Sequence, residues 1–450
     1  MEVAILVIFI AGYVAIAFEH SLMVSKAATA LLTGVLTWTL FIFSESNPES
    51  TLHALEGQVA EIAQILFFLI GAMTIVELID VHGGFDILTR VIRTQRKVTL
   101  LWIIALITFF LSAALDNLTT AIVMVSLIGK LIDDRKDRLL FAGIVIIAAN
   151  AGGAWSPIGD VTTTMLWIKE KFTPIDVMSN LFLPSLVSLL APLAILSFWV
   201  KGRVAAPLRV EIDDSLETQK NLASWLQGQP GSEIESVEEA EVSQSQKLAV
   251  LVLGLVSLVF VPVFKLVTHL PPFMGMMLSL SVMWIVTELL HKRKQDALKD
   301  KFSPAHALER IDIPSMLFFL GILLAVGALQ VSGILGDLAV WLDTSLPNRN
   351  AVVVMIGLLS AVVDNVPLVS GAIQMYDPVN YPDLATPNHP FWQFLAYCAG
   401  TGGSILIIGS AAGVAVMGIE RVEFFWYVKR ISWLALIGYF AGVGVFLLMA

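Results

Sequence analysis

The chain has 450 residues, of which 57% are hydrophobic and 14% charged, and its mean hydropathy is +0.82. Soluble domains carry about 25% charged residues, so this composition excludes a soluble globular protein and indicates a polytopic all-α membrane protein with the lipid bilayer as its partner. The net charge of −10 gives no indication of nucleic-acid binding, and the single cysteine, Cys398, excludes a disulfide framework.

Apolar runs predict about ten membrane crossings. They lie at about 3–18, 26–43, 61–80, 139–169, 184–200, 247–267, 271–290, 312–330, 391–418 and 431–449. The crossings 139–169 and 391–418 are predicted to be broken helices, because small residues interrupt them and a proline lies in the first. The crossings 26–43 and 271–290 are candidates for a static scaffold or for the contact face of a homodimer.

Two further apolar segments, 99–130 and 352–376, are predicted to be re-entrant helical hairpins. Basic clusters flank 99–130 on both sides, and both can face the cytoplasm only if this segment enters and leaves the membrane on one side. With this topology, all lysines and arginines lie inside except Lys169, Lys171, Lys265 and Arg349. We expect a bacterial inner (plasma) membrane protein with its N-terminus outside, the hairpin 99–130 entering from the cytoplasm and the hairpin 352–376 entering from the outer side.

The two predicted hairpins share a sequence motif. Ser112-Ala-Ala-Leu-Asp116-Asn117 corresponds to Ser360-Ala-Val-Val-Asp364-Asn365, about 250 residues later. The Gly-Gly pair in each broken helix corresponds at a similar offset. Because equivalent loops lie on opposite sides, the sequence predicts two inverted repeats, 1–200 and 247–450, joined by an acidic cytoplasmic linker at 201–246.

Non-helical backbone within a membrane persists only where protein or a wet cavity covers it. We therefore expect the two hairpin tips and the two broken helices to converge near the midplane. Their polar groups are carboxylates, amides and hydroxyls, which suit a hard cation. The candidate ion-binding and proton-binding residues are Ser112, Asp116, Asn117, Thr119, Thr120, Asn150, Ser156, Asp160, Thr162, Thr163, Ser360, Asp364, Asn365, Thr401, Ser404 and Glu61. For sodium itself, the expected ligands are Asp116, Asn117, Asp364, Asn365, Thr401 and Ser404.

Plainer roles stay open for the acids in this set. Asp116 and Asp364 could each cap the second half-helix of a hairpin, with Thr119 or Val366 as an early helical residue. Asp160 could cap the helix that carries Thr162. Glu61 could be an ordinary acid at the membrane interface.

These motifs resemble the NhaD-type sodium/proton antiporters of the ion-transporter superfamily, which also contains arsenite pumps and divalent-anion/sodium symporters. The resemblance covers essentially the whole chain and rests on Ser112–Asn117 with Thr119-Thr120, Asn150–Thr163, Ser360–Asn365 and Thr401–Ser404. It implies export of Na⁺ or Li⁺ in exchange for H⁺, tolerance of sodium and alkaline pH, and the involvement of Glu61, with no cofactor.

The mechanism that we expect is competition between Na⁺ and H⁺ for the aspartates within the membrane. Burial raises the pKa of a carboxylate and a bound cation lowers it, so each acid holds either a proton or part of a sodium shell. The alternative is an arsenite or anion transporter of the same build. An enzyme is not expected, because the patterns of intramembrane aspartyl proteases are missing, and a passive channel would ignore a pH gradient.

Overall fold

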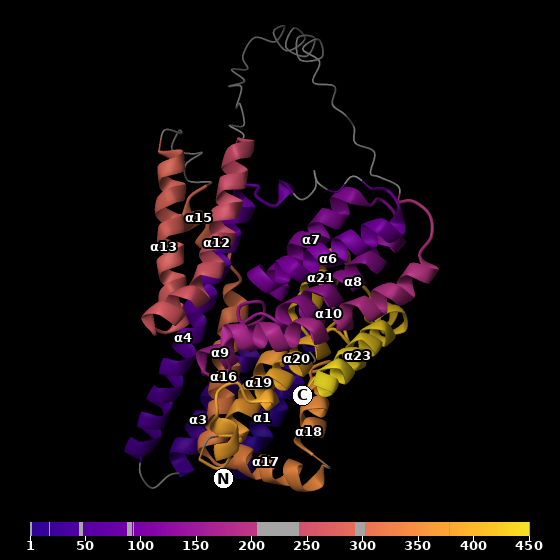
Figure 1. Cartoon of the computed structure of the whole chain (residues 1–450). Helices are drawn as coiled ribbons and strands as arrows, with labels where there is room; N and C mark the ends of the chain where they lie inside the picture. Colours follow the sequence, from indigo (N-terminus) through magenta and orange to yellow (C-terminus); the bar gives the residue numbers. More distant parts are fainter. Residues whose placement is uncertain are drawn as a thin grey trace, which may run out of the picture.

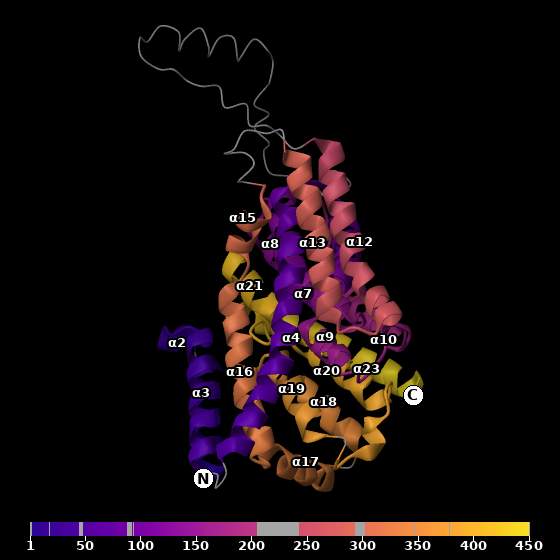
Figure 2. The ribbon, with the colours of Figure 1, turned by 90° about the vertical axis from the view of Figure 1, so that its left-hand side faces the viewer.

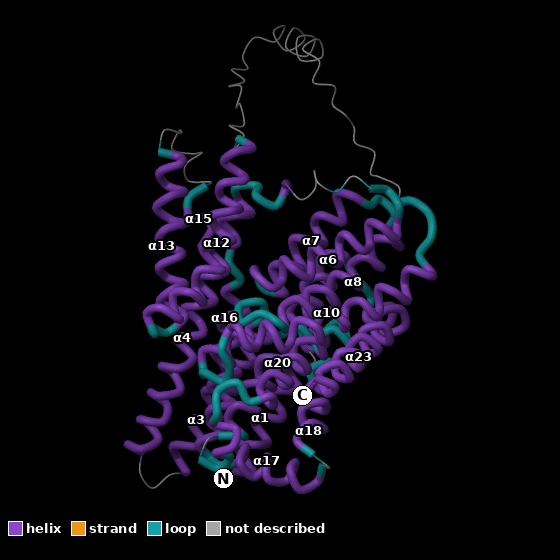
Figure 3. The backbone as a smooth tube through the Cα atoms, viewed as in Figure 1, coloured by secondary structure: helices purple, strands orange, loops and turns teal. Residues whose placement is uncertain are grey.

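The computed structural model describes residues 2–17, 19–44, 48–87, 92, 94–204, 243–292, 302–346, 348–377 and 379–449. Most of the predicted linker, residues 205–242, therefore lies outside the described residues. Within those ranges the chain is helical, without strands, and only an isolated bridge joins Arg96 to Arg203 (Figure 3). Nine helices in this part of the chain are long and apolar enough to cross a membrane. The prediction of an all-α polytopic membrane protein is confirmed.

One group of helices, which we call the scaffold group, includes the long helix α4 and the helices that pack along it or along one another. Its members are α1 (Glu2–Ala17), α3 (Lys26–Ser44), α4 (Pro48–Val81), α12 (Gln244–Thr268), α13 (Pro272–His291) and α16 (Ile313–Val331). Helices α12 and α13 pack beside α4, and α3 packs along α16 (Figures 1 and 2).

Helices α3 and α16 are in very close contact. A Cβ atom on Gly34 or Gly321 would overlap the backbone of the opposite helix, so small residues permit this crossing. The indole nitrogen of Trp38 on α3 also donates a hydrogen bond to the carbonyl oxygen of Leu324 on α16, at 2.8 Å.

The other helices form a second group, which we call the core group. They are α6 (Lys97–Leu115), α7 (Asn117–Leu131), α8 (Arg135–Ala154), α9 (Val161–Ile168), α10 (Pro174–Trp199), α18 (Arg349–Leu359), α19 (Asn365–Met375), α20 (Pro390–Gly402), α21 (Ala411–Glu420) and α23 (Trp433–Met449). Helix α6 packs on α8, α18 on α20, α7 on α21, and α10 on α23. Short helices, including α2 (Glu19–Leu22), α15 (Pro304–Arg310) and α17 (Ile334–Ser345), connect the longer ones.

Helices α6 and α7 are antiparallel arms, so that the start of α6 and the end of α7 lie together. At that end the Lys97 ammonium lies 2.7 Å from a carboxylate oxygen of Asp137. Lys130, near the end of α7, pairs with Asp86 at 3.2 Å. We call this end of the molecule the Lys97 face.

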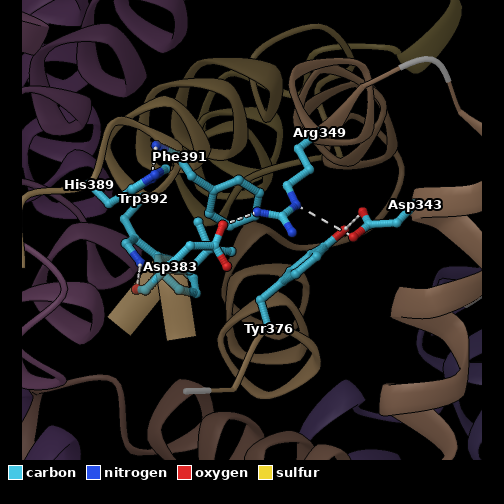
Figure 4. A network of polar contacts seen from close by, with 8 residues as sticks. Asp343, Arg349, Tyr376, Asp383, His389, Phe391 and Trp392 are labelled. Atoms are coloured by element: carbon cyan, nitrogen blue, oxygen red, sulfur yellow. Dashed lines mark hydrogen bonds and ion pairs between the residues drawn. The ribbon is translucent and has the colours of Figure 1, made fainter. Parts of the chain in front are cut away.

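The arms α18 and α19 open toward the opposite end, which we call the Arg349 face (Figures 1 and 2). There the Arg349 guanidinium pairs with Asp383 and lies 3.4 Å from Asp343, which also accepts a 3.0 Å hydrogen bond from the Tyr376 hydroxyl (Figure 4). The hydrogen bond from Arg349 lowers the pKa of Asp383. These contacts hold both ends of the hairpin to one place.

Two crossings extend further than the sequence predicts. Helix α4 begins at Pro48 rather than near 61 and runs for 34 residues. Helix α10 begins at Pro174, after the cap Thr173, and continues through Pro184 and Pro192. Prolines are tolerated inside membrane helices because neighbouring groups can satisfy the freed carbonyls.

Candidate functional site

The tip of the first hairpin is formed by Asp116, between α6 and α7. Its backbone φ is 112°, an uncommon conformation for a residue other than glycine. Its carboxylate accepts hydrogen bonds from the Thr119 backbone nitrogen at 2.7 Å and from the Thr119 hydroxyl at 2.8 Å. Asp116 therefore caps α7, and these contacts support the strained backbone at the tip.

The tip of the second hairpin is also formed by an aspartate that caps the following helix. The Asp364 carboxylate accepts a hydrogen bond from the Val366 backbone nitrogen at 3.2 Å and so caps α19. Asp364 also lines a cavity of about 70 Å³, together with Tyr13, Glu19 and Lys26. In contrast to the buried Asn365 beside it, Asp364 is partly exposed.

Each hairpin is attached to a broken helix by an equivalent contact. The Ser112 hydroxyl donates to the carbonyl oxygen of Ala149 at 2.6 Å, and the Ser360 hydroxyl donates to that of Ala399 at 2.8 Å.

Glycines make these two contacts close. A Cβ on Gly152 would overlap the carbonyl oxygen of Phe109, and a Cβ on Gly402 would overlap that of Gly357. The Gly-Gly pairs thus allow each broken helix to lie directly against the first arm of a hairpin.

Both broken helices resume at a capping residue. Asp160 caps α9, accepting from the Thr162 backbone nitrogen at 2.8 Å and from the Thr162 hydroxyl at 2.6 Å. Ser410 caps α21, accepting from the Gly413 backbone nitrogen at 3.2 Å. The first broken helix is thus α8 and α9, and the second is α20 and α21.

Asp160 is also the point at which the two hairpins meet. Its carboxylate accepts hydrogen bonds from the Asn117 amide at 2.5 Å and from the Asn365 amide at 3.2 Å. Asn117 also donates to the Asn150 side-chain oxygen at 3.0 Å, and Asn150 donates to the Ser410 hydroxyl at 3.0 Å. We call Asn117, Asn150, Asp160, Asn365 and Ser410 the central network.

The electrostatics of the central network are unusual. Asp160 is 1% exposed, and in the part of the chain that the structure describes it is the one buried Asp or Glu, with no buried Lys or Arg. Asp116 and Asp364, one on each hairpin, directly precede the two asparagines that contact Asp160. A buried carboxylate in such surroundings needs a proton or a metal cation to neutralise it.

The structure places the other predicted residues around this centre. The Thr163 hydroxyl donates to the Asp160 carbonyl oxygen at 2.9 Å. The Thr401 and Ser404 hydroxyls donate to backbone carbonyls of their own segment, those of Tyr397 and Thr401. Ser156 and Thr120 are buried, and the Thr120 hydroxyl has no hydrogen-bond partner among the described residues.

Glu61 lies elsewhere. Its side chain is 46% exposed and forms an ion pair with Lys169, just after α9. Lys265 of α12 lies 3.4 Å from the Glu170 carboxylate in the same turn. These two ion pairs connect the end of α9 to the scaffold helices α4 and α12.

Sequence reasoning missed Ser410 and Lys26. Ser410 was detectable, because Ile158-Gly159-Asp160 corresponds to Ile408-Gly409-Ser410 at the offset of the repeat. Lys26 had no such signal, since it starts an apolar helix and only the fold brings it into a cavity with Asp364.

Cavities lie beside the two hairpin tips. One, of about 200 Å³, is lined by Glu77, Asp80, Thr119 and Arg310, among others. A second, of about 420 Å³, shares Leu118 and Asp312 with the first, and shares Lys26 with the cavity at Asp364. The fold and this site define a polytopic membrane transporter built around hairpin tips and broken helices.

Comparisons with known proteins identify the family. A family model described as "Citrate transporter" matches residues 13–392. "Sodium/proton antiporter 1" and "Sodium/proton antiporter 2" of Arabidopsis thaliana are 45% and 43% identical to this chain. The alignments cover 99% of this chain and 72% of the first relative, and 97% of this chain and of the second.

"Na(+)/H(+) antiporter NhaD" of Alkalimonas amylolytica is 31% identical over 98% of this chain and 89% of its own length. The chain therefore belongs to the NhaD-type sodium/proton antiporter family, and sodium/proton antiport is its function.

Proposed function

We propose that Na⁺ and H⁺ compete at the central network, with Asp160 as the shared carboxylate and with Asp116 and Asp364 as flanking acids. The observation that carries this proposal is that amides from both hairpin tips donate to one carboxylate, which is 1% exposed. The network offers carboxylate, amide and hydroxyl oxygens, which suit Na⁺ and Li⁺. Because one neutralising charge suffices, binding of a cation and protonation exclude each other.

The two asparagines adapt the network to either occupant. In the described arrangement the Nδ2 atoms of Asn117 and Asn365 point at Asp160. Each amide also has a carbonyl oxygen, and rotation of the side chain presents this acceptor instead of the donor. The same two residues thus solvate a carboxylate in one state and ligate a cation in the other.

The halves 1–200 and 247–450 act as inverted repeats that alternate access to this network. Three correspondences support this reading: the bonds of Ser112 and Ser360, the contacts of Gly152 and Gly402, and the caps Asp160 and Ser410. The predicted acidic linker joins the halves. An inverted repeat permits two mirror-related conformations around one site.

The Lys97 face is the cytoplasmic one, in a plasma membrane. The basic residues Arg96, Lys97 and Lys130 favour this orientation, since cytoplasmic loops are enriched in Lys and Arg. A cavity that includes Lys130 and Asp86 of this face reaches Thr119, while the ion pairs of Glu61 and Glu170 tie α9 to the scaffold group. This conformation is therefore the one open to the cytoplasm.

An anionic substrate is the second candidate, which the description of the family model favours. Lys26, beside Asp364, is the basic group that could attract it. The central network argues for a cation, because its ionisable member is an acid and an anion beside it would be repelled.

Direct measurement of proton release tests the competition. Purified protein in weakly buffered detergent solution at alkaline pH receives NaCl, LiCl, choline chloride or choline citrate while the pH is recorded. We expect Na⁺ and Li⁺ to release protons, and the choline salts to release none. Absence of proton release on addition of Na⁺ or Li⁺ would overturn the proposal, and proton uptake on addition of citrate, beyond that of a protein-free control, would favour the anion transporter.

A further inference from the structure

We infer that Arg310 sets the affinity for the transported cation at the Lys97 face, by holding a fixed positive charge at the wall of the access cavity. The inference rests on the proposed exchange at the central network and adds a residue that controls how the cation arrives there. It concerns the 200 Å³ cavity between α4, α7 and α15, which we call the access cavity.

The access cavity ends close to the first hairpin tip. Its lining includes Thr119, whose hydroxyl donates to the Asp116 carboxylate at 2.8 Å. An ion in the cavity is thus separated from the tip acid by one side chain. Solvent meets the cavity at the Lys97 face, near Lys130 and Asp86.

Arg310 occupies the wall of this cavity together with two acids of α4. Its Nε atom lies 2.8 Å from a carboxylate oxygen of Glu77, and an Nη atom lies 3.7 Å from Asp80. The Arg310 side chain is 47% exposed, whereas that of Glu77 is 20% exposed. The guanidinium thus covers Glu77 and remains partly exposed to solvent itself.

The charges that line the access cavity determine how the contact between Arg310 and Glu77 affects an incoming cation. Besides Glu77, Asp80 and Arg310, the lining of the access cavity includes Asp86, Asp312 and Lys130. Acids predominate, so the cavity attracts cations, and Arg310 reduces that attraction. An arginine keeps its charge at every pH at which an antiporter works. The reduction is therefore constant, and an incoming Na⁺ always competes with a tethered cation.

A shift in affinity follows for variants that change this charge. A cavity lined by one sign of charge raises the local concentration of the opposite ion, by about tenfold or more in strong cases. Removing the positive charge of Arg310 should therefore lower the half-saturating Na⁺ concentration at this face by about threefold to tenfold. The maximal rate should change little, because Arg310 does not touch the central network.

The experiment measures Na⁺/H⁺ exchange from each face separately. Everted vesicles expose the Lys97 face under the proposed orientation, and right-side-out vesicles expose the Arg349 face. The variants are Arg310→Gln, Arg310→Lys, Glu77→Gln and the double variant Glu77→Gln/Arg310→Gln. Lys136→Gln is the matched control, because Lys136 is an exposed basic residue at the start of α8 on the same face.

We expect the half-saturating Na⁺ concentration at the Lys97 face to follow the local charge. It should be lowest in Arg310→Gln, close to wild type in Arg310→Lys, in the double variant and in Lys136→Gln, and highest in Glu77→Gln. The values at the Arg349 face should stay unchanged. A role in folding alone would reduce the amount of active protein and the maximal rate without producing this order.

Equal values in Arg310→Gln and wild type would overturn the inference, as would a change of the same size in Lys136→Gln. If Arg310→Gln fails to insert, the pair of Glu77→Gln and the double variant decides, and the double variant must have the lower value. Failure of the proposed competition is distinguishable, because wild-type protein would then bind Na⁺ without releasing protons.

Discussion

Replacing Asp160 with asparagine tests the centre of the site, because it removes the buried charge and nearly keeps the size of the side chain. In the wild type the two carboxylate oxygens accept from Asn117, Asn365 and Thr162. An asparagine has one oxygen, and its amide group would face other donors. One unsatisfied buried donor costs about 1–3 kcal/mol. We expect the variant to insert with stability reduced by that amount.

The loss of transport should be far larger than the loss of stability. A unit cation about 3 Å from a carboxylate is attracted by roughly 5 kcal/mol at an effective dielectric constant of about 20. Since about 1.4 kcal/mol corresponds to a factor of ten, affinity should fall by about three orders of magnitude or more. The variant also lacks the proton that Na⁺ would displace, so exchange should disappear.

The assay is dequenching of a pH-sensitive dye in everted vesicles after addition of Na⁺ or Li⁺, with thermal unfolding in detergent as the measure of integrity. Asp383→Asn is the matched control, because Asp383 is an exposed acid paired with Arg349 at the opposite face. Exchange by Asp160→Asn with a half-saturating Na⁺ concentration within about threefold of wild type would refute the reasoning.

Three further predictions concern the surroundings of the network. Asp116→Asn and Asp364→Asn should each abolish the dye signal while the protein remains inserted, and wild-type exchange in either variant would remove that acid from the mechanism. Ser410→Ala removes the cap of α21 and the acceptor of Asn150, so the free energy of unfolding should fall by about 0.5–2 kcal/mol, measured by thermal or denaturant unfolding; an unchanged transition would contradict this role. Partial burial favours a higher pKa for Asp86, but hydrogen bonds from Lys130 and Lys247 outweigh it and lower that pKa. The stabilisation from Asp86 is then present above the ordinary carboxylate pKa and lost as the pH falls through the lowered value, so Asp86→Asn should make the melting temperature less dependent on acid pH, and equal slopes for both proteins would argue against it.

Much of the fold could be predicted, because hydrophobic length and basic loops follow simple rules in membranes. The crossings near 26–43, 247–267 and 312–330 correspond to α3, α12 and α16 within a few residues. The extra length of α4 could not be predicted, since the polar turns before Glu61 read as a loop and only packing shows that they continue the helix. The ion pair of Glu61 with Lys169 was also inaccessible, because it joins segments whose adjacency depends on the whole fold.

The central network shows why the repeated Asp-Asn phrase was informative and yet insufficient. Because the aspartate is the only member of the Asp-Asn pair that can carry a charge, it is the residue that one would expect where the two hairpins meet. An aspartate at an N-cap, however, turns its carboxylate toward the first backbone nitrogens of its own helix, as Asp116 and Asp364 do. The next residue starts the helix about 100° further around its axis, so it is the asparagine that faces the centre. Capping and ion binding favour the same residue types, and sequence alone cannot separate them.

The asymmetry between Asp160 and Ser410 explains how an inverted repeat can have one centre rather than two. Both residues cap the second half of a broken helix at equivalent places in the chain. If both were acids, each hairpin could contact a carboxylate of its own half, and two like charges would lie in one buried network. Because the second position is a serine, Asn117 and Asn365 both donate to the single carboxylate of Asp160. A proton or a cation that neutralises Asp160 therefore changes the hydrogen bonds of both hairpins at once. Under the proposed mechanism, occupancy of the site would thereby be coupled to both halves of the chain, as exchange by alternating access requires.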